Sequence, residues 1–299
     1  MLNAKLEALQ ESFNPSVLTQ LLDPLFKEKE IELWVKRDDL IHPIISGNKW
    51  RKLKYILDHA LTLGADSIIS MGGAYSNHLH ALAFAGKQLN LKTLAYIRGE
   101  RPKNFSPTLK DLQLWGMELR FVSRTEYREL RGYKSHDSLP GLDKGQYWLP
   151  EGGATELALK GVAEIISEIN LDYDILCVPC GTGATLAGLI KANTAENMIY
   201  GFSALKGGDF LFQDVEKLLK QQTTNWTVQL DYHFGGFAKT NNELKLFMQH
   251  FLSQHAIELE PVYTAKMFYA LYDLIQQDQF KPGQRLIAIH TGGLQGNRS

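Results

Sequence analysis

A lysine at the start of a basic segment is the residue whose type and setting suggest covalent chemistry. Lys49 lies in the segment SGNKWRKL, Ser46–Leu53, where a Ser-Gly-Asn turn precedes a helix-forming stretch. The helix dipole and the nearby Arg51 and Lys52 disfavour a charged amine, which lowers the pKa of Lys49 and makes it more nucleophilic. A solvated basic helix face is one alternative interpretation, and a helix that binds nucleic acid is another.

A glycine-rich loop is the second candidate. The segment GTGATLAG, Gly181–Gly188, follows the predicted strand Ile175–Val178 and begins a helix. Its small residues would let backbone N–H groups converge on an anion at the helix N-terminus, where the dipole also favours negative charge. The spacing fits neither the dinucleotide fingerprint nor the P-loop. This leaves a compact cradle for one phosphate monoester, or a tight strand-to-helix turn without a ligand.

The segment GGAYSNHLH, Gly72–His80, repeats the order of strand, glycine turn and helix. Ser76 and Asn77, together with N–H groups of the turn, could hold a carboxylate. Alternatively, Ser76 only caps the helix. His78 and His80 stand two residues apart, but no cysteine or carboxylate cluster accompanies them, so we predict no metal site.

Two further motifs carry weaker signals. In EPVYTAKM, Glu260–Met267, Thr264 is the predicted N-cap of a helix. Cys177 and Cys180 form a CxxC pair inside a predicted strand, where residues three apart point to opposite faces. We therefore expect no redox pair at these cysteines.

These segments connect alternating strands and helices. Strands are predicted at 31–35, 67–71, 91–97, 119–122, 175–178, 198–203, 226–232 and 285–290, and helices at 50–63, 78–89, 108–115, 155–169, 185–192, 210–219, 243–255 and 264–277. This alternation predicts an α/β fold with mostly parallel sheets covered on both faces. The stretch 123–146 is predicted to be a loop, with a domain boundary near 145–155. The pattern does not tell to which group of elements the first strand belongs.

Composition restricts the class of protein. The chain has 299 residues, a length that favours two domains, and 32 Lys plus Arg against 33 Asp plus Glu give a formal net charge of −1. That balance argues against non-specific binding to nucleic acid or acidic membranes. No apolar run approaches the ~20 residues that span a bilayer, the N-terminus has no apolar signal region, and two cysteines cannot staple the fold. We expect a cytoplasmic protein.

The order of the motifs resembles that of the pyridoxal-phosphate (PLP) enzymes of the tryptophan synthase β fold type. SGNKWRKL, GGAYSNH, CGTGATLAG, EPVYTAKM and HTGG are similar to the family of 1-aminocyclopropane-1-carboxylate (ACC) deaminase and D-cysteine desulfhydrase, from about Leu33 to Gly293. The resemblance implies two three-layer α/β/α domains with mostly parallel sheets. The larger cofactor domain would comprise residues 1–49 plus 156–299, and the smaller substrate-closing domain residues 50–155. It also implies a homodimer.

The resemblance implies roles for individual residues. Lys49 would bind the cofactor aldehyde covalently and serve as acid and base at the substrate Cα. Ser76 would bind the substrate carboxylate and relay a proton, and Tyr263 would face the substrate. The implied cofactor contacts are Asn77 at the phenolic oxygen, Thr264 at the pyridine nitrogen, and Gly181, Thr182, Gly183, Ala184 and Thr185 around the 5′-phosphate. The implied substrate-binding residues are Tyr75, Ser76, Asn77, His78 and Phe234.

Departures from the family pattern bear on the substrate. ACC deaminases place a Glu where this chain has Thr264. A carboxylate there keeps the pyridine nitrogen protonated and makes the ring a stronger electron sink, whereas Thr is the desulfhydrase-like residue. Tyr75, His80 and Phe234 also differ from the family pattern, on the side where the substrate is expected.

We therefore predict a PLP-dependent lyase that deaminates a small amino acid. The favoured reaction is a D-cysteine desulfhydrase-like β-elimination that gives a 2-oxo acid, ammonia and sulfide. ACC deaminase activity, which gives 2-oxobutanoate and ammonia, is the alternative. A non-catalytic protein that binds phosphate or a nucleotide is an alternative of another class.

Overall fold

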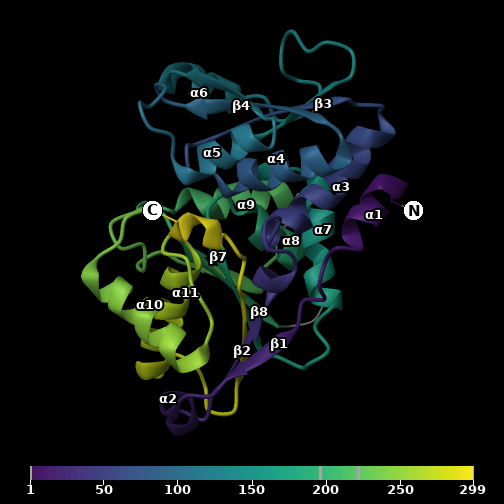
Figure 1. Ribbon diagram of the computed structural model, residues 1–299. Coiled ribbons are helices and arrows are strands. Elements are labelled where there is room, and N and C mark those ends of the chain that lie inside the picture. Colours follow the sequence, from purple (N-terminus) through teal and green to yellow (C-terminus); the bar gives the residue numbers. More distant parts are fainter. Residues whose placement is uncertain (1, 195–196, 221–222, 299) are drawn as a thin grey trace.

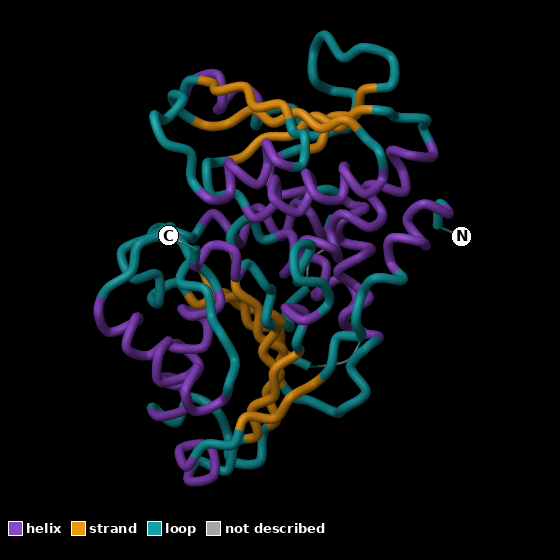
Figure 2. Tube along the Cα trace, in the orientation of Figure 1, coloured by secondary structure: helices purple, strands orange, loops and turns teal. Residues whose placement is uncertain are grey.

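Two mostly parallel sheets, each covered by helices on both faces, build the molecule. The computed structural model describes residues 2–194, 197–220 and 223–298. In Figure 1 the smaller sheet lies at the top and the larger one below it, and Figure 2 shows helices filling the layer between the two groups of strands. The mixed α/β architecture with mostly parallel sheets is the one predicted.

Within the described residues, the larger sheet has six strands in the order β1-β2-β10-β7-β8-β9. They are β1 (Leu18–Leu21), β2 (Glu32–Lys36), β7 (Ile175–Cys180), β8 (Met198–Ser203), β9 (Trp226–Gln229) and β10 (Arg285–Ile289). Only β1 runs antiparallel to its neighbour. Because β2 pairs with β10, the first predicted strand belongs to this sheet.

Helices cover both faces of the larger sheet. They are α2 (Pro24–Glu28), α10 (Asn242–His255) and α11 (Thr264–Gln276) on one face, and α7 (Glu156–Ser167), α8 (Ala184–Ala192) and α9 (Phe210–Leu219) on the other. Side chains of β7 alternate between the two apolar clusters, so that Cys177 lies in one and Cys180 in the other. This membership of different clusters confirms that the two cysteines, both free and buried, point to opposite faces.

In the part of the chain that the structure describes, the smaller sheet has four parallel strands in the order β5-β4-β3-β6. They are β3 (Ser67–Gly72), β4 (Lys92–Arg98), β5 (Glu118–Val122) and β6 (Gln146–Leu149). The helices that pack on its inner face are α1 (Ala4–Gln10), α3 (Asn48–Thr62), α4 (Asn77–Leu89) and α5 (Pro107–Leu114). A smaller cluster that includes Tyr127 covers the outer face.

The predicted loop at 123–146 is wrong in part, because it contains α6 (Arg124–Leu130). This helix buries only Tyr127, so its sequence has no apolar periodicity to detect. The sequence feature that could have predicted this helix is the capping box formed by Ser123 and Glu126. The domain limits at 49/50 and 155/156 stay a prediction, since α3 spans the first limit and packs against both α4 and α7.

Asp38, in the short 3-10 segment η1 (Asp38–Leu40), forms hydrogen bonds with residues before and after Lys49. Its backbone carbonyl accepts a hydrogen bond of 2.8 Å from Gly47 N–H. Its carboxylate accepts from Arg51 Nη2 at 3.0 Å, and the Asp38 and Arg51 side chains are both almost fully buried. Arg51 also donates to Glu168 just after α7. These contacts determine where the first turn of α3 lies.

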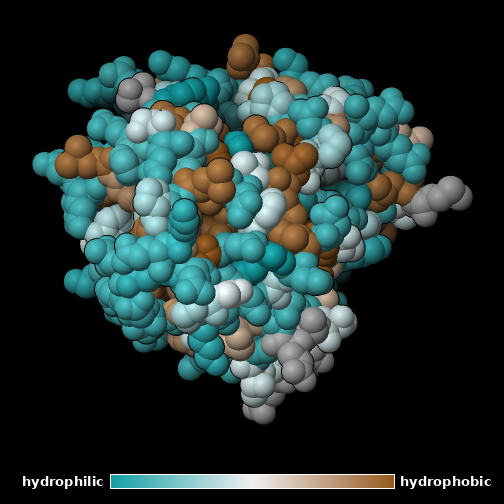
Figure 3. All heavy atoms as spheres, turned by 90° about the horizontal axis from the view of Figure 1, so that it is seen from below, coloured by the Kyte–Doolittle hydropathy of each residue, from teal (hydrophilic) through white to brown (hydrophobic). Residues whose placement is uncertain are grey.

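The surface carries apolar groups in separate small patches. Figure 3 shows them in brown among hydrophilic residues on the face seen from below. Within residues 2–194, 197–220 and 223–298, no helix has the combination of length and apolar character needed to cross a membrane.

Replacing Asp38 tests whether the buried ion pair stabilises the fold. Asp38→Ala leaves the buried Arg51 guanidinium with fewer partners, so we expect the free energy of unfolding to fall by about 3 kcal/mol. Urea denaturation measures this change. The control is Glu118→Ala, which breaks the solvent-exposed pair with Arg120 and should change stability little. Equal losses in the two variants would contradict the assignment.

Candidate active site

The candidate site lies where the carboxyl ends of strands from both sheets face each other. The loops after β2, β7 and β10 come from the larger sheet, and the loop after β3 comes from the smaller one. Ligands of open α/β sheets bind at such carboxyl ends. The loop before Lys49 passes close to the loop after β10, since a Cβ on Gly47 would lie 2.0 Å from Thr291 O. Gly47 also has a φ of 61°, which favours glycine.

Lys49 lies in the first turn of α3 and is close to the glycine loop. Its Nζ donates to Asn48 Oδ1, and Asn48 Nδ2 donates to Thr185 Oγ1 at 3.0 Å. Burial lowers the pKa of the Lys49 amine to about 8, although the Glu260 carboxylate acts in the opposite direction. The amine is therefore far more readily deprotonated than that of an ordinary lysine.

The basic residues that follow Lys49 are buried. Arg51, Lys52 and Lys54 are 4%, 5% and 7% exposed. Arg51 and Lys54 form ion pairs with acidic residues from the α7 region. A solvated basic face, or a helix face that binds nucleic acid, needs exposed cations, so both alternative interpretations are wrong.

The glycine loop leads into α8 with unpaired backbone donors. Gly183, with a φ of 73°, is the N-cap, and no side chain from the described part of the protein caps this end. Ala184 and Thr185 form the first turn of α8 and are buried. The free N–H groups and the helix dipole favour an anion here. The geometry thus fits the cradle predicted for a phosphate.

Lys52 is a site residue that the sequence analysis did not identify. Burial, and next the charge of Lys49, lower the pKa of its amine to about 7. Among the described residues, none forms a hydrogen bond or ion pair with its Nζ, while Cys180 at the end of β7 is an electrostatic neighbour. The sequence feature that could have identified Lys52 is its spacing, because a residue three positions after Lys49 lies on the same face of a helix.

Ser76 and Asn77 lie at the start of α4, directly after the loop that follows β3. Ser76 is the N-cap, and its Oγ accepts from Leu79 N–H at 3.2 Å, which leaves the hydroxyl proton available to a ligand. Asn77 Oδ1 accepts a hydrogen bond from Gln295 Nε2. Tyr75 is 67% exposed. The cap is therefore confirmed, and the substrate roles of all three residues stay predictions.

His78 is a neutral, buried imidazole. Its Nε2 lies 2.9 Å from Ser70 Oγ, and its Nδ1 has no hydrogen-bond partner in the described part of the chain. Burial, and then the charges of Lys49 and Lys52, lower its pKa to about 3. At neutral pH the ring is uncharged, so it cannot neutralise a substrate carboxylate. Its predicted contact with substrate would be a hydrogen bond through Nδ1.

Glu260, and not Thr264, caps the start of α11. The buried Glu260 carboxylate accepts from the backbone N–H groups of Val262, Tyr263 and Thr264 at 2.8, 2.8 and 2.6 Å. Burial raises the pKa of Glu260, and these three hydrogen bonds act against that rise. Thr264 Oγ1 accepts from Glu260 N–H at 2.9 Å. The prediction that Thr264 caps this helix is wrong, because the Glu260 carboxylate, four residues earlier in the chain, accepts the hydrogen bonds from these N–H groups.

Tyr263 lies against the glycine loop. A Cβ on Gly181 would be 3.0 Å from its ring and 3.2 Å from its hydroxyl oxygen. Burial raises the pKa of Tyr263, so its hydroxyl stays protonated at neutral pH. Phe234 packs edge-on against Tyr269, whereas Phe237 of the same loop contacts Tyr263, with ring centroids 6.0 Å apart. The substrate contact of Phe234 stays a prediction. Because Phe237 is the one of the two that contacts Tyr263, the structure favours Phe237 as the aromatic residue near the substrate.

The side chains that converge here fit PLP. The uncapped start of α8 and the partnerless Lys52 match a phosphate monoester, and Lys49 offers an amine of lowered pKa close by. Asn77 lies at the start of α4, and its amide N–H is a group that can donate to a phenolic oxygen. The residues at this edge could therefore hold the cofactor's aldehyde and its anionic tail together.

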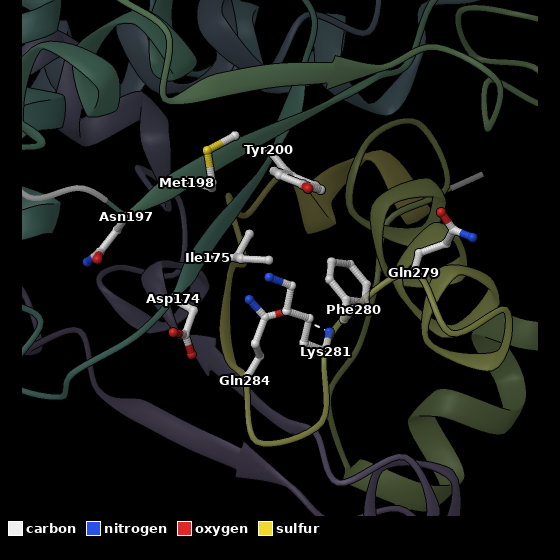
Figure 4. Close-up of a pocket in the computed structure, with 9 residues that line it drawn as sticks. All are labelled: Asp174, Ile175, Asn197, Met198, Tyr200, Gln279, Phe280, Lys281 and Gln284. Carbon is white, nitrogen blue, oxygen red and sulfur yellow. Dashed lines mark hydrogen bonds between the residues drawn. The ribbon is translucent and has the colours of Figure 1, made fainter.

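A surface hollow of about 350 Å³ lies at the opposite edge of the larger sheet, at the amino ends of β7 and β8. Figure 4 shows its lining, which comprises Asp174, Ile175, Asn197, Met198, Tyr200, Gln279, Phe280, Lys281 and Gln284. None of the predicted site residues lines it. This hollow is therefore separate from the candidate site, which lies at the carboxyl ends of the strands.

Comparisons with known proteins agree with the geometry. The model of the family described as "Pyridoxal-phosphate dependent enzyme" matches residues 17–292. A protein of Pyrococcus horikoshii, named as an inferred 1-aminocyclopropane-1-carboxylate deaminase, is 31% identical over 93% of this chain and 89% of its own length.

Two further relatives carry related names. A mitochondrial protein of Arabidopsis thaliana, named bifunctional D-cysteine desulfhydrase/1-aminocyclopropane-1-carboxylate deaminase, is 30% identical over 89% of this chain and 73% of its own length. A crystal structure titled as an ACC deaminase homologue superposes with a TM-score of 0.77 at 26% identity, covering 99% of this chain and 97% of that one.

The lowered pKa of Lys49 predicts how PLP capture depends on pH. A neutral amine attacks the aldehyde, so capture by the cofactor-free protein should increase as pH rises through about 8, well below the ordinary lysine value of 10.5. Borohydride fixation at each pH, followed by peptide mapping, measures the labelled fraction. Lys49→Ala is the control and should take up no label. A midpoint near 10.5, or label on Lys52, would contradict the prediction.

The unpaired charge of Lys52 predicts selectivity for the phosphate group. Lys52→Met should weaken PLP binding about tenfold or more, because a charge-assisted hydrogen bond is lost. Binding of pyridoxal, which lacks the phosphate, should change little. Titration of protein fluorescence with both ligands gives the two affinities. A parallel loss for pyridoxal would assign Lys52 a structural role instead.

Proposed function

The chain belongs to the family of PLP-dependent enzymes, and from this membership we propose that it deaminates D-cysteine or a similar β-substituted amino acid by β-elimination. The products would be a 2-oxo acid, ammonia and, from cysteine, sulfide. One observation carries the proposal. A lysine amine with a pKa of about 8 is linked through a single side chain, Asn48, to the first turn of a helix that has no side-chain cap.

The proposed chemistry divides between cofactor and protein. When bound, PLP supplies an electron sink for the bond that breaks at the substrate Cα. Lys49 holds and moves the proton at Cα, since its amine titrates near neutral pH and can act as both base and acid. Lys52, Thr185 and the N–H groups at the start of α8 hold the phosphate.

Substrate recognition is proposed for the facing wall of the site. The hydroxyl proton of Ser76 and the N–H groups at the start of α4 bind the substrate carboxylate. Tyr263, protonated at neutral pH, presents its hydroxyl beside the glycine loop. We propose that residues 50–155 close over the substrate to exclude water, and that the protein acts as a cytoplasmic homodimer.

The residue at position 264 favours a β-substituted amino acid over ACC. Thr264 brings no carboxylate to the pyridine nitrogen, and the carboxylate of the nearby Glu260 is occupied by three backbone donors. Opening a cyclopropane ring needs a stronger electron sink than the elimination of a thiol. ACC deaminase activity remains the second candidate, because it is named for the relatives from Pyrococcus horikoshii and Arabidopsis thaliana.

A substrate panel tests the proposal. The PLP-loaded protein should show a visible absorbance band and should release sulfide and pyruvate from D-cysteine faster than it releases 2-oxobutanoate from ACC. L-cysteine and D-serine complete the panel, and sulfide, pyruvate and 2-oxobutanoate are quantified for each. Lys49→Ala is the negative control. The substitution Thr264→Glu is a poor discriminator, since it would bury a second carboxylate beside Glu260.

Each alternative predicts a different result. Efficient 2-oxobutanoate release from ACC would establish the second candidate, and sulfide from L-cysteine alone would reverse the stereochemical preference. A protein that binds PLP without a visible band, and without label on Lys49 after borohydride, would be a phosphate-binding protein rather than an enzyme.

A further inference from the structure

The role proposed for Asn77 requires one orientation of its amide. A carboxamide has an acceptor end and a donor end, and only the N–H end can stabilise a phenolic oxygen. The two ends have nearly the same shape, so packing alone does not select between them. A hydrogen-bond partner on the far side of the amide has to make the selection.

Gln295 is that partner. Its Nε2 donates to Asn77 Oδ1, across 218 positions of sequence. With its oxygen engaged, Asn77 directs Nδ2 to the side where Gly293 lies, since a Cβ on Gly293 would be 2.6 Å from Nδ2. The absence of a side chain at position 293 therefore keeps the space beside this donor open.

Gln295 belongs to the 3-10 segment η3 (Leu294–Asn297), whose C-terminal end is bound to both groups of elements. On the side of the larger sheet, Asn297 Nδ2 donates to Glu258 Oε1 at 2.7 Å and to Leu259 O at 3.0 Å. On the other side, Arg298 Nη2 donates to Asp111 Oδ2 of α5 at 2.5 Å. In Figure 1 the C-terminus accordingly lies at the junction of the two groups of elements.

We propose that Gln295 is a positioning residue that fixes the Asn77 amide with its N–H end toward the cofactor's phenolic oxygen. Gln295 acts only through Asn77. The inference rests on the proposed function, because it presumes bound PLP. The η3 segment, held by Asn297 and Arg298, supplies the rigidity that a single side-chain contact would lack.

Three variants test this role. Gln295→Glu keeps the shape but offers only acceptors above the carboxyl pKa, so the Asn77 amide should turn its N–H end away from the site. Gln295→Met removes the contact without imposing the opposite orientation. Gln88→Glu makes the same charge change at an exposed position of α4 and serves as the matched control.

The main readout is the pH titration of the visible band of the PLP-loaded protein. A donor lost from the phenolic oxygen makes that oxygen more basic, so the midpoint should move to higher pH. We expect a shift of about one pH unit in Gln295→Glu, a smaller shift in Gln295→Met, and none in Gln88→Glu. Thermal unfolding of the cofactor-free proteins should show similar midpoints throughout, because the side chain of Gln295 is partly exposed.

The outcomes separate this inference from the proposed function. Unchanged midpoints in both Gln295 variants, with a normal band in the wild type, overturn the positioning role alone. A shift of equal size in Gln88→Glu overturns it as well, because a general charge effect would then explain the result. A wild type with no visible band overturns the proposed function and the positioning role together.

Discussion

A buried ion pair between Asp38 and Arg51 determines where the amine of Lys49 lies. Removing two charges from water is costly, and the cost is offset only when geometry and additional hydrogen bonds are good. Arg51 satisfies that condition by sharing its guanidinium between Asp38 and Glu168. Because Asp38 also accepts a hydrogen bond from Gly47, the residues two before and two after Lys49 are both fixed to η1.

This rigid frame supports a site with an unbalanced charge distribution. Lys49 is half-buried and the neighbouring Lys52 is buried, and burial is the largest cause of the lowered pKa of each amine. Glu260 is the carboxylate that acts on Lys49, but its oxygens accept three backbone N–H groups at the start of α11. An anion bound at the start of α8 would balance the positive charges of Lys49 and Lys52. In the function that we propose, the phosphate of PLP would supply that negative charge.

The two sheets contribute different parts of this site. The larger sheet provides the glycine loop and the loop after β10, whereas α4 of the smaller sheet provides Ser76 and Asn77. Lys49 lies at the start of α3, which packs against both α7 and α4. The chain crosses between the two groups again at η3, where Asn297 and Arg298 bind opposite sides. The four residues of η3 and the Arg298 that follows therefore couple the two halves of the site near the end of the chain.

Local pattern in the sequence determined most of the elements and the motif-bearing loops. Buried parallel strands appear as short apolar runs and the helices between them as apolar faces, so β2 to β5 and β7 to β10 were found within a few residues. Lys49, the glycine loop and the Ser76 cap could be identified because their chemistry depends on near neighbours in the chain. The elements α1, β1, α2, α6 and β6 were missed, since each is only four to seven residues long and too short to show a clear period.

Only the tertiary structure decided the remaining features. The capping carboxylate of Glu260, the unpaired amine of Lys52, the contact of Phe237 with Tyr263 and the hydrogen bond from Gln295 to Asn77 are all of this kind. Each depends on which atoms meet, and which charges remain unpaired, once residues far apart in sequence are packed together. A local pattern carries no information about a hydrogen bond that joins positions 77 and 295, because the fold alone brings those two side chains within reach.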